Sequence, residues 1–230
     1  MRLNLDELDA RRLLGGGPVL LVSSSYRGHH NVLPVAYAMN LSIVPPMIGI
    51  ALHPGRHSTD VIRKTNEFAI NIPTRELLHH VQYLGTLSGV EFDKLELTNL
   101  PTFRARRVGT VLLEGCIGWI ECALEDMIEM GDHLLVVARV VAVTADDEAF
   151  NDHWLLTDNE LKPLHYLGGN YYSMLDYVME ARIPQSAEEY GKSLNEAVTE
   201  QLELTKDAAE QRLEEDYERD EFRRREGFEP

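Results

Sequence analysis

Cysteine, positive charge and long apolar runs are all scarce in this chain of 230 residues. Its two cysteines, Cys116 and Cys122, lack the CxxC spacing of redox or metal sites and the density of a secreted disulfide framework, so we expect a reducing, cytoplasmic setting. No apolar run reaches the ~20 residues that a membrane helix requires. Asp6, Glu7 and Asp9 stand where a secretory signal would be basic. We therefore expect neither export nor a membrane partner.

Basic residues are outnumbered by acidic ones, 22 to 38, and the formal net charge is −16. Proteins that bind a nucleic-acid backbone or an anionic membrane need clustered positive charge, so both partners are disfavoured. An anionic ligand of this chain must therefore be held by a local group of donors.

Several common catalytic motifs are absent from the sequence, namely GxxxxGK[ST], GxGxxG after a strand, HExxH and GxSxG. Gly15–Gly17 precedes a predicted strand, so a flexible entry to the sheet is favoured over a phosphate loop. The neighbours His29 and His30, and likewise His79 and His80, point in different directions on a strand or a helix. We predict no metal site.

Seven segments rich in Val, Ile, Leu and aromatic residues predict strands, at residues 18–25, 31–40, 46–53, 67–72, 111–123, 133–145 and 164–167. Residues 26–30 predict a hairpin turn in which Gly28 adopts a positive φ. The nearly continuous apolar run 134–143 is typical of a strand buried on both faces. About seven strands without a βαβ repeat favour a closed antiparallel barrel.

Two short helices are predicted among the strands, with Ser58 as the N-cap of residues 59–65 and Thr74 as the N-cap of residues 75–84. The last segment, residues 184–230, holds 15 acidic and 7 basic residues and a narrow apolar stripe at three- to four-residue steps. It reads as an acidic helical extension, either a solvated helix or a partner-binding one. We expect a mainly β domain over residues 1–183 and this helical tail over residues 184–230.

A candidate anion site lies where the strand ending at His53 meets the Pro54–Gly55 turn. Arg56 and the hydroxyl of Ser58 follow at a predicted helix N-terminus, where free N–H groups and the helix dipole favour negative charge. Ordinary N-capping by Ser58 beside a surface arginine explains the same residues. From this segment alone, both interpretations stay open.

An ordered set of segments resembles the flavin reductase-like, FMN-binding split-barrel family that includes flavoredoxin. The segments are residues 31–42, Pro45 to Leu52, Arg56-His57-Ser58, Glu67 to Pro73, Ser88-Gly89 with Asp93-Lys94, Ile120 to Cys122, Gly131-Asp132-His133 and Pro163 to Tyr172. The resemblance covers roughly residues 15–175. It implies an antiparallel split β-barrel that forms a homodimer, with FMN bound non-covalently near the subunit interface.

The resemblance also assigns site residues. It implies that cofactor-binding residues are Asn31, Ala36, Tyr37, Ala38, Met39, Asn40, Ser42, Arg56, His57, Ser58, Asn71, Ser88, Gly89 and Lys94, and that His133 meets the nicotinamide. Plainer roles are open for some of them: Asn31 and Asn71 can close turns or cap sheet edges, Tyr37 can belong to the core, and His133 can serve a turn.

The resemblance implies an FMN-dependent oxidoreductase that transfers hydride from NADH or NADPH to the flavin and passes electrons to a diffusible acceptor or a protein. Alignment of the two rings carries such a step, which agrees with the absence of a catalytic triad. The alternatives are a flavin-holding or electron-transfer protein reduced by a partner, and a split-barrel protein that has lost the cofactor.

Overall fold

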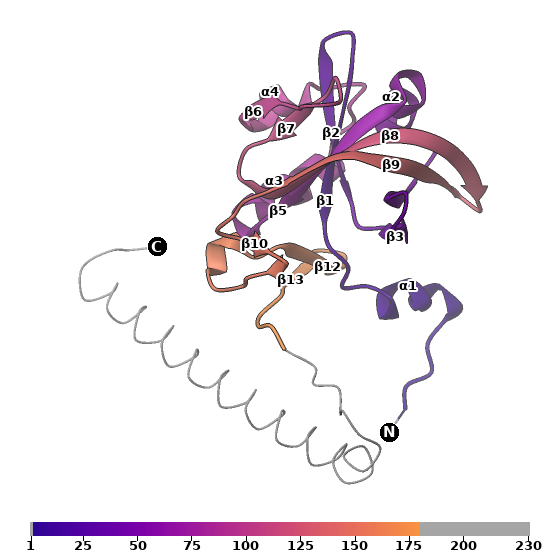
Figure 1. The fold of residues 1–230 in the computed structure, drawn as a ribbon. Coiled ribbons are helices and arrows are strands. Elements are labelled where there is room, and N and C mark those ends of the chain that lie inside the picture. Colours follow the sequence, from indigo (N-terminus) through magenta and orange to yellow (C-terminus); the bar gives the residue numbers. More distant parts are fainter. Residues whose placement is uncertain (1, 180–230) are drawn as a thin grey trace. The chain divides into compact units, whose positions relative to one another are not determined.

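The computed structural model describes residues 2–179, and the predicted helical tail of residues 184–230 lies outside them (Figure 1). The thirteen strands of the described residues are β1 (Leu20–Tyr26), β2 (His29–Val35), β3 (Ala38–Ser42), β4 (Met47–Leu52), β5 (Glu67–Pro73), β6 (Thr102–Arg104), β7 (Val111–Leu113), β8 (Cys116–Met130), β9 (His133–Ala145), β10 (Phe150–Asn151), β11 (His153–Trp154), β12 (Leu164–Gly168) and β13 (Tyr171–Met174). The helices are α1 (Ala10–Leu13), α2 (His57–Thr65), α3 (Leu78–Thr86) and α4 (Lys94–Thr98), with 3₁₀ turns η1 (Glu7–Asp9), η2 (Arg75–Leu77) and η3 (Asn159–Leu161).

Seven strands form one curled antiparallel sheet in the order β2-β1-β5-β8-β9-β4-β3, which confirms the mainly β, split-barrel architecture. The expectation of a closed sheet is wrong in detail. No ladder among the described residues joins the edge strand β2 to β3 or β4. The chain crosses this gap through Ala36 and Tyr37, where the Tyr37 carbonyl accepts from the Ala51 backbone N–H at 2.9 Å.

Local sequence explains the β1–β2 hairpin, whose turn residues Arg27 and Gly28 have φ of 52° and 82°. Positive φ at both central residues matches the twist of the flanking strands.

Two predicted strands are interrupted in the structure. Residues 31–40 divide between β2 and β3 at the crossing, and residues 111–123 divide between β7 and β8 at Gly115, whose φ is 76°.

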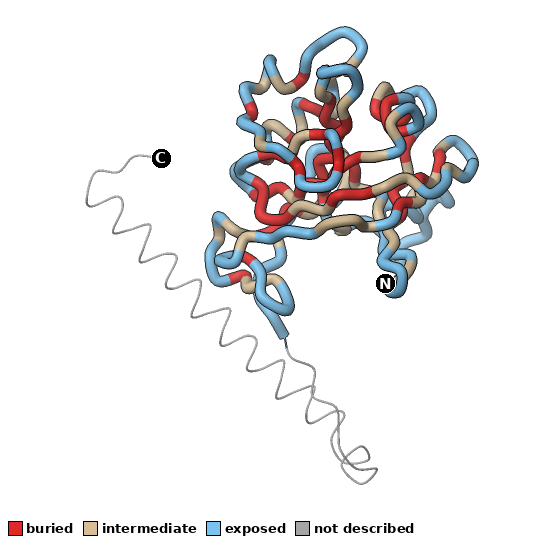
Figure 2. Tube along the Cα trace, turned by 45° about the horizontal axis from the view of Figure 1, so that its top comes forward, coloured by how far each residue is buried: buried red, intermediate tan, exposed pale blue. Residues whose placement is uncertain are grey.

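The core lies in two layers on either side of β1, and Figure 2 shows the buried residues gathered in the interior of the described chain. Leu20 and Val22 face the inside of the sheet with Phe68 and Val136, while Leu21 packs outside with Val32 and the α3 residues Val81 and Leu84. The strands buried on both faces are therefore β1 and β5. The prediction of this burial for residues 134–143 is wrong, because β9 alternates between buried and partly or fully exposed positions.

The helices begin close to their predicted positions but differ in their caps. Arg56, with extended φ and ψ of −80° and 133°, is the N-cap of α2, so the prediction of Ser58 as N-cap is wrong. Ser58 lies inside the first turn of α2, where its hydroxyl accepts from Asn31. Thr74 does precede η2, which leads into α3, but its side chain makes no capping bond. None of the helices in residues 2–179 combines the length and apolar character of a bilayer-spanning helix.

Candidate functional site

A cavity of about 410 Å³, here called the split cavity, opens at the gap between β2 and β4. Leu33 and Val35 of β2 and Leu52 of β4 form its buried apolar wall. The C-terminal half of α3 and the β12–β13 hairpin complete the lining. The break in the sheet therefore creates a cavity of the size that small-molecule ligands occupy, roughly 300–1,000 Å³.

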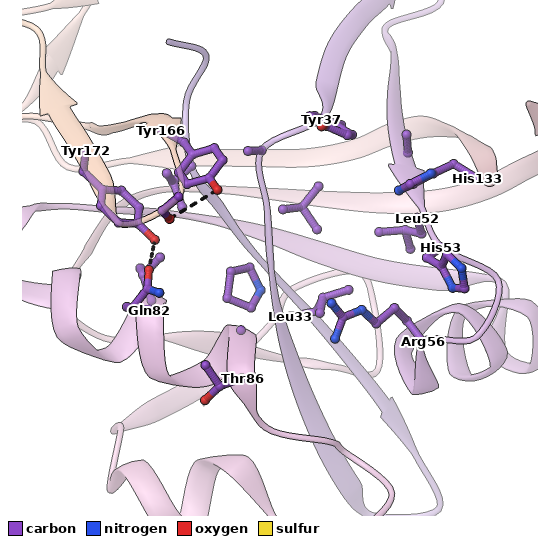
Figure 3. A pocket seen from close by; sticks show the side chains of 18 residues that line it. Leu33, Tyr37, Leu52, His53, Arg56, Gln82, Thr86, His133, Tyr166 and Tyr172 are labelled. Carbon is purple, nitrogen blue, oxygen red and sulfur yellow. Dashed lines mark hydrogen bonds between the residues drawn. The ribbon is translucent and has the colours of Figure 1, made fainter. Parts of the chain in front are cut away.

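Aromatic and polar side chains close one side of the split cavity (Figure 3). The Tyr172 hydroxyl donates to Gln82 Oε1 of α3 at 2.6 Å, and the rings of Tyr166 and Tyr172 lie 5.4 Å apart. The Tyr166 hydroxyl donates to the Gly169 carbonyl at 3.3 Å. These contacts tie the β12–β13 hairpin to α3 and hold two flat rings against the cavity.

Two histidines and the side chain of Arg56 lie on the opposite side (Figure 3). His133 Nδ1 donates to Asp132 Oδ1 at 2.7 Å, and this bond is the largest cause that lowers the pKa of Asp132. The His53 ring meets the His133 ring edge-on at 5.9 Å. The Gly55 N–H donates to His53 Nδ1 at 3.1 Å, so the proton of a neutral His53 ring resides on Nε2. Both rings are thus held by their Nδ1 atoms.

A second group of polar residues, here called the amide cradle, consists of Asn31, His57, Ser58 and Gly89. Asn31 Nδ2 donates to Ser58 Oγ at 2.5 Å, and both residues are buried. Asn31 Oδ1 and His57 Nδ1 are buried with no hydrogen-bond partner among the described residues. A Cβ on Gly89 would overlap Asn31 Oδ1 and lie 3.0 Å from His57 Nδ1. Only glycine leaves room beside these two atoms.

The cradle adjoins, in the chain, the residues at the Arg56 end of the split cavity, although none of its four residues lines that cavity. Arg56 lines the cavity and directly precedes His57, while Thr86 lines it two residues before the Ser88-Gly89 loop. The side chain of Arg56 forms no ion pair with any described residue. The first turn of α2 adds backbone N–H groups and the positive end of the helix dipole. This end of the cavity therefore suits an anion.

Lys94 fastens the loop that carries Gly89. Its ammonium group donates to the Val32 and Leu84 carbonyls, each at 3.0 Å, and its residue is 2% exposed. Burial, helped by the charge of Arg56, lowers the pKa of Lys94 to about 8. Lys94 joins the strand of Asn31 to the end of α3 and adds positive charge near the cradle.

The structure divides the predicted site residues into groups. Ala36, Tyr37, Arg56 and His133 line the split cavity, and Asn31, His57, Ser58 and Gly89 form the cradle. Ala38 and Met39 line a neighbouring cavity that shares Ala36 and Tyr37. Asn40 and Ser42 pair with β4 and line neither cavity. Ser88 is exposed, and its hydroxyl accepts from the Val90 N–H at 3.3 Å.

Asn71, also a predicted site residue, is fully engaged inside the sheet. Its Nδ2 donates to the Leu21 carbonyl at 2.8 Å and to Ser23 Oγ at 3.1 Å, and its Oδ1 accepts from the Leu113 N–H at 2.8 Å. It lines neither cavity, so its side chain is placed to join β1, β5 and β7.

Sequence reasoning missed His53, Gln82, Thr86, Tyr166 and Tyr172 as lining residues. His53 ends a predicted strand directly before the Pro54–Gly55 turn, and this position beside the anion motif was an available signal. The other residues come from α3 and from a hairpin about 80 residues later, and no local pattern brings these two segments together.

Comparisons with known proteins agree with this architecture. The model of the family described as "Flavin reductase like domain" matches residues 14–174. An uncharacterized protein of Pyrococcus abyssi is 34% identical over 143 residues, which span 62% of this chain and 82% of the relative. Among solved structures, an FMN-binding protein from Thermus thermophilus with bound p-hydroxybenzaldehyde has a TM-score of 0.67 and 25% identity, covering 79% of this chain and 99% of that chain. An FMN-binding domain of a flavin reductases-like enzyme from Shewanella baltica has a TM-score of 0.66 and 26% identity, covering 77% and 96%.

Proposed function

Because the chain belongs to the flavin reductase-like family of split-barrel proteins, we propose that it binds FMN non-covalently and takes hydride from NADH or NADPH. The observation that carries the proposal is the amide cradle. Asn31 Oδ1 and His57 Nδ1 are buried without partners, and His57 directly follows Arg56, a cation at one end of a cavity with a buried apolar wall. FMN combines a phosphate with a flat apolar ring, which matches these two ends.

The residues of the cradle fit a phosphate. Rotation of the Asn31 amide about its last bond lets Ser58 Oγ donate to the amide oxygen and turns the NH₂ group toward Gly89. His57 Nδ1 supplies a second donor when it carries the proton, and Arg56 supplies a fork of N–H groups that matches phosphate oxygens. The absence of a side chain at Gly89 leaves the space that a phosphate needs.

The other end of the split cavity fits the ring. The backbone of Ala36 and Tyr37 crosses the gap in the sheet, and the small side chain of Ala36 permits a close approach to the main chain. The buried apolar wall of Leu33, Val35 and Leu52 excludes water from that side of the ring. When bound, FMN accepts hydride and passes the electrons onward. The protein's own task is to hold the ring and leave one face open to the donor.

His133 is the proposed residue at the nicotinamide. The hydrogen bond to Asp132 fixes the His133 ring and leaves Nε2 as the ring nitrogen for a ligand. The centroids of the Tyr37 and His133 rings lie 5.9 Å apart. The His53 ring packs edge-on against the His133 ring and supports its position.

The proposal includes the assembly and setting expected from the family. Exposed apolar residues Ile43 and Val44 in the β3–β4 turn, 90% and 88% exposed, support a homodimer with the flavin near the interface. The two buried, unpaired cysteines are compatible with a reducing cytoplasm. The proposal also includes an acceptor protein that takes electrons from the reduced flavin.

Anaerobic mixing of FMN-loaded protein with NADH and with NADPH tests the function. The visible absorbance band of the oxidised flavin is expected to bleach with at least one of them. Stable FMN binding without bleaching by either nucleotide contradicts the reductase proposal and favours the electron-carrier alternative. A protein whose melting temperature does not rise with added FMN contradicts both, since a ligand that binds only the folded state stabilises it.

A further inference from the structure

A second cavity, of about 710 Å³, adjoins the split cavity and shares with it Ala36, Tyr37, Ala51, Tyr166 and Gly169. Its remaining walls come from β3, from the β12–β13 turn and from the N-terminal segment that carries α1. In Figure 1, α1 lies on the β3 side of the sheet, near β12. The two cavities meet at Tyr37, whose side chain is 46% exposed, and together form one groove along the split of the barrel.

The outer end of this groove is lined by two arginines, Arg11 and Arg12. Arg12 Nη1 is paired with Asp9 Oδ1 at 3.0 Å. The side chain of Arg11 has neither a hydrogen bond nor an ion pair within residues 2–179. Arg11 is exposed and lines this cavity without an acidic partner among the described residues, so its guanidinium group is available to an anion. Its planar fork of N–H groups matches a phosphate.

The segment that presents Arg11 is fastened to the barrel. The Gly16 N–H donates to the Tyr166 carbonyl at 2.8 Å, and the Tyr166 N–H donates to the Gly17 carbonyl at 3.0 Å. His165 Nδ1 lies 2.6 Å from the Gly16 carbonyl, and Gly15 fits so closely that a Cβ would lie 2.9 Å from the Arg12 carbonyl. These contacts give the Gly15–Gly17 segment an anchoring role and hold α1 at the edge of the second cavity.

The groove thus has a cation near each end, Arg56 in the split cavity and Arg11 in the second cavity, with the small residues Ala36 and Ala38 between them. A dinucleotide whose nicotinamide ring lies on the flavin must carry its pyrophosphate and adenosine away from that ring. The outer part of the groove, beyond Tyr37, is open to receive them, while Arg56 lines the split cavity at the other end.

We propose that Arg11, with Arg12 beside it, binds a phosphate group of the nicotinamide dinucleotide in the second cavity and so raises the affinity of the protein for the dinucleotide. This inference rests on the proposed function. The phosphate is either the adenosine-side phosphate of the pyrophosphate, which NADH and NADPH share, or the 2′-phosphate that only NADPH carries. Both present the same chemistry to the arginine.

Isothermal titration of FMN-loaded protein with NAD⁺, NADP⁺ and nicotinamide mononucleotide tests the site without turnover. In Arg11→Gln, the dissociation constants for NAD⁺ and NADP⁺ are expected to rise about tenfold if the pyrophosphate is bound. If the 2′-phosphate is bound, only the constant for NADP⁺ rises. The mononucleotide keeps the phosphate next to its own ribose but lacks the adenosine-side phosphate and the 2′-phosphate, so its constant is expected to change by less than about twofold. Arg11→Lys keeps the charge without the fork and is expected to give an intermediate loss.

Two further variants sharpen the test. Arg75→Gln removes an exposed arginine that lines neither cavity and is expected to bind all three nucleotides as the wild type does. Asp9→Asn releases Arg12 from its ion pair and is expected to tighten dinucleotide binding by about twofold to threefold. The dissociation constant for FMN serves as the check on folding, because Arg11 lies outside the cradle.

The outcomes separate this inference from the proposed function. Wild-type protein that binds dinucleotides, with unchanged constants in Arg11→Gln, overturns the inference alone. An equal loss for all three nucleotides also overturns it, because the arginine then does not act on the phosphates that the mononucleotide lacks. Wild-type protein that binds FMN but neither dinucleotide overturns the proposed donor, and with it the inference.

Discussion

Asn71 on β5 and Asn31 on β2 are both buried in the same sheet, yet they use their side-chain amides differently. The Asn71 amide donates two hydrogen bonds to residues of β1 and accepts one from a backbone N–H of β7. Asn31 makes one bond, to Ser58, and leaves its oxygen without a partner beside Gly89. Since a buried polar atom without a partner costs free energy, the first amide is suited to stabilise the fold and the second to receive a ligand.

The same contrast separates two sites that gather backbone N–H groups. The buried carboxylate of Glu121 accepts from the N–H groups of Arg106, Arg107 and Val108 at 2.5 to 3.0 Å, so the loop before β7 already encloses its anion. The N-terminus of α2 faces a cradle with no carboxylate of its own. Donors that an internal anion satisfies are structural, and donors that lack one are available to a ligand.

The largest expected effect is on the free energy of unfolding, when the side-chain amide of Asn71 is removed from the sheet. Asn71→Ala leaves the Leu113 N–H and the Leu21 carbonyl without partners, and we expect a loss of about 2–4 kcal/mol in unfolding free energy. Urea denaturation of the FMN-free protein measures it. FMN affinity at low temperature is expected to stay within about twofold of the wild type. A folded variant that binds FMN much more weakly contradicts the structural assignment of Asn71.

Removal of the cation beside the cradle gives the next effect. Arg56→Ala is expected to raise the FMN dissociation constant by about tenfold to 100-fold, because a charge-assisted hydrogen bond to the phosphate is lost. Fluorescence titration of FMN measures the change. Arg63→Ala is the matched control, since Arg63 lies on the same helix and pairs with Asp60 at 3.2 Å. An unchanged constant in Arg56→Ala would show that the phosphate binds elsewhere.

The ligand-facing asparagine gives a smaller loss of affinity and little loss of stability. Asn31→Ala removes one donor to the phosphate and one bond to Ser58, so we expect about a tenfold weaker FMN affinity and a stability loss near 1 kcal/mol. Denaturation and titration on the same preparations, beside Asn71→Ala, give the comparison directly. If Asn31→Ala is the less stable variant and binds FMN normally, the roles of the two residues are reversed.

The smallest expected effect is a pH dependence at Lys94, whose pKa is lowered to about 8. Below this pKa the ammonium is charged and attracts a phosphate, and above it the attraction is lost. A bound anion raises the pKa of Lys94, so FMN affinity is expected to fall about threefold between about pH 7 and about pH 9. Lys94→Met is expected to lose this slope. A wild-type affinity that is constant over the same range contradicts the proximity of Lys94 to the phosphate.

Local pattern was sufficient for much of the fold. Residues 133–145 form β9 as predicted, and the Arg27-Gly28 turn joins β1 to β2 as the glycine indicates. The sequence pattern gave wrong predictions where contacts with residues far along the chain decide the burial of a strand or the cap of a helix. In the apolar run 134–143, buried positions alternate with partly or fully exposed ones, and the Ser58 hydroxyl accepts a hydrogen bond from Asn31 instead of capping α2.

The sequence by itself determined where most strands and turns occur, the order of the segments that identify the family, and the excess of acidic over basic residues. These properties depend on residues close together in the chain, on their periodicity and on composition. The tertiary structure decided which of two buried asparagines lacks a partner, which tyrosines close the split cavity, and that Arg11 borders the same groove as Tyr37. The partner of a side chain is set by packing between segments tens of residues apart, and no local pattern records it.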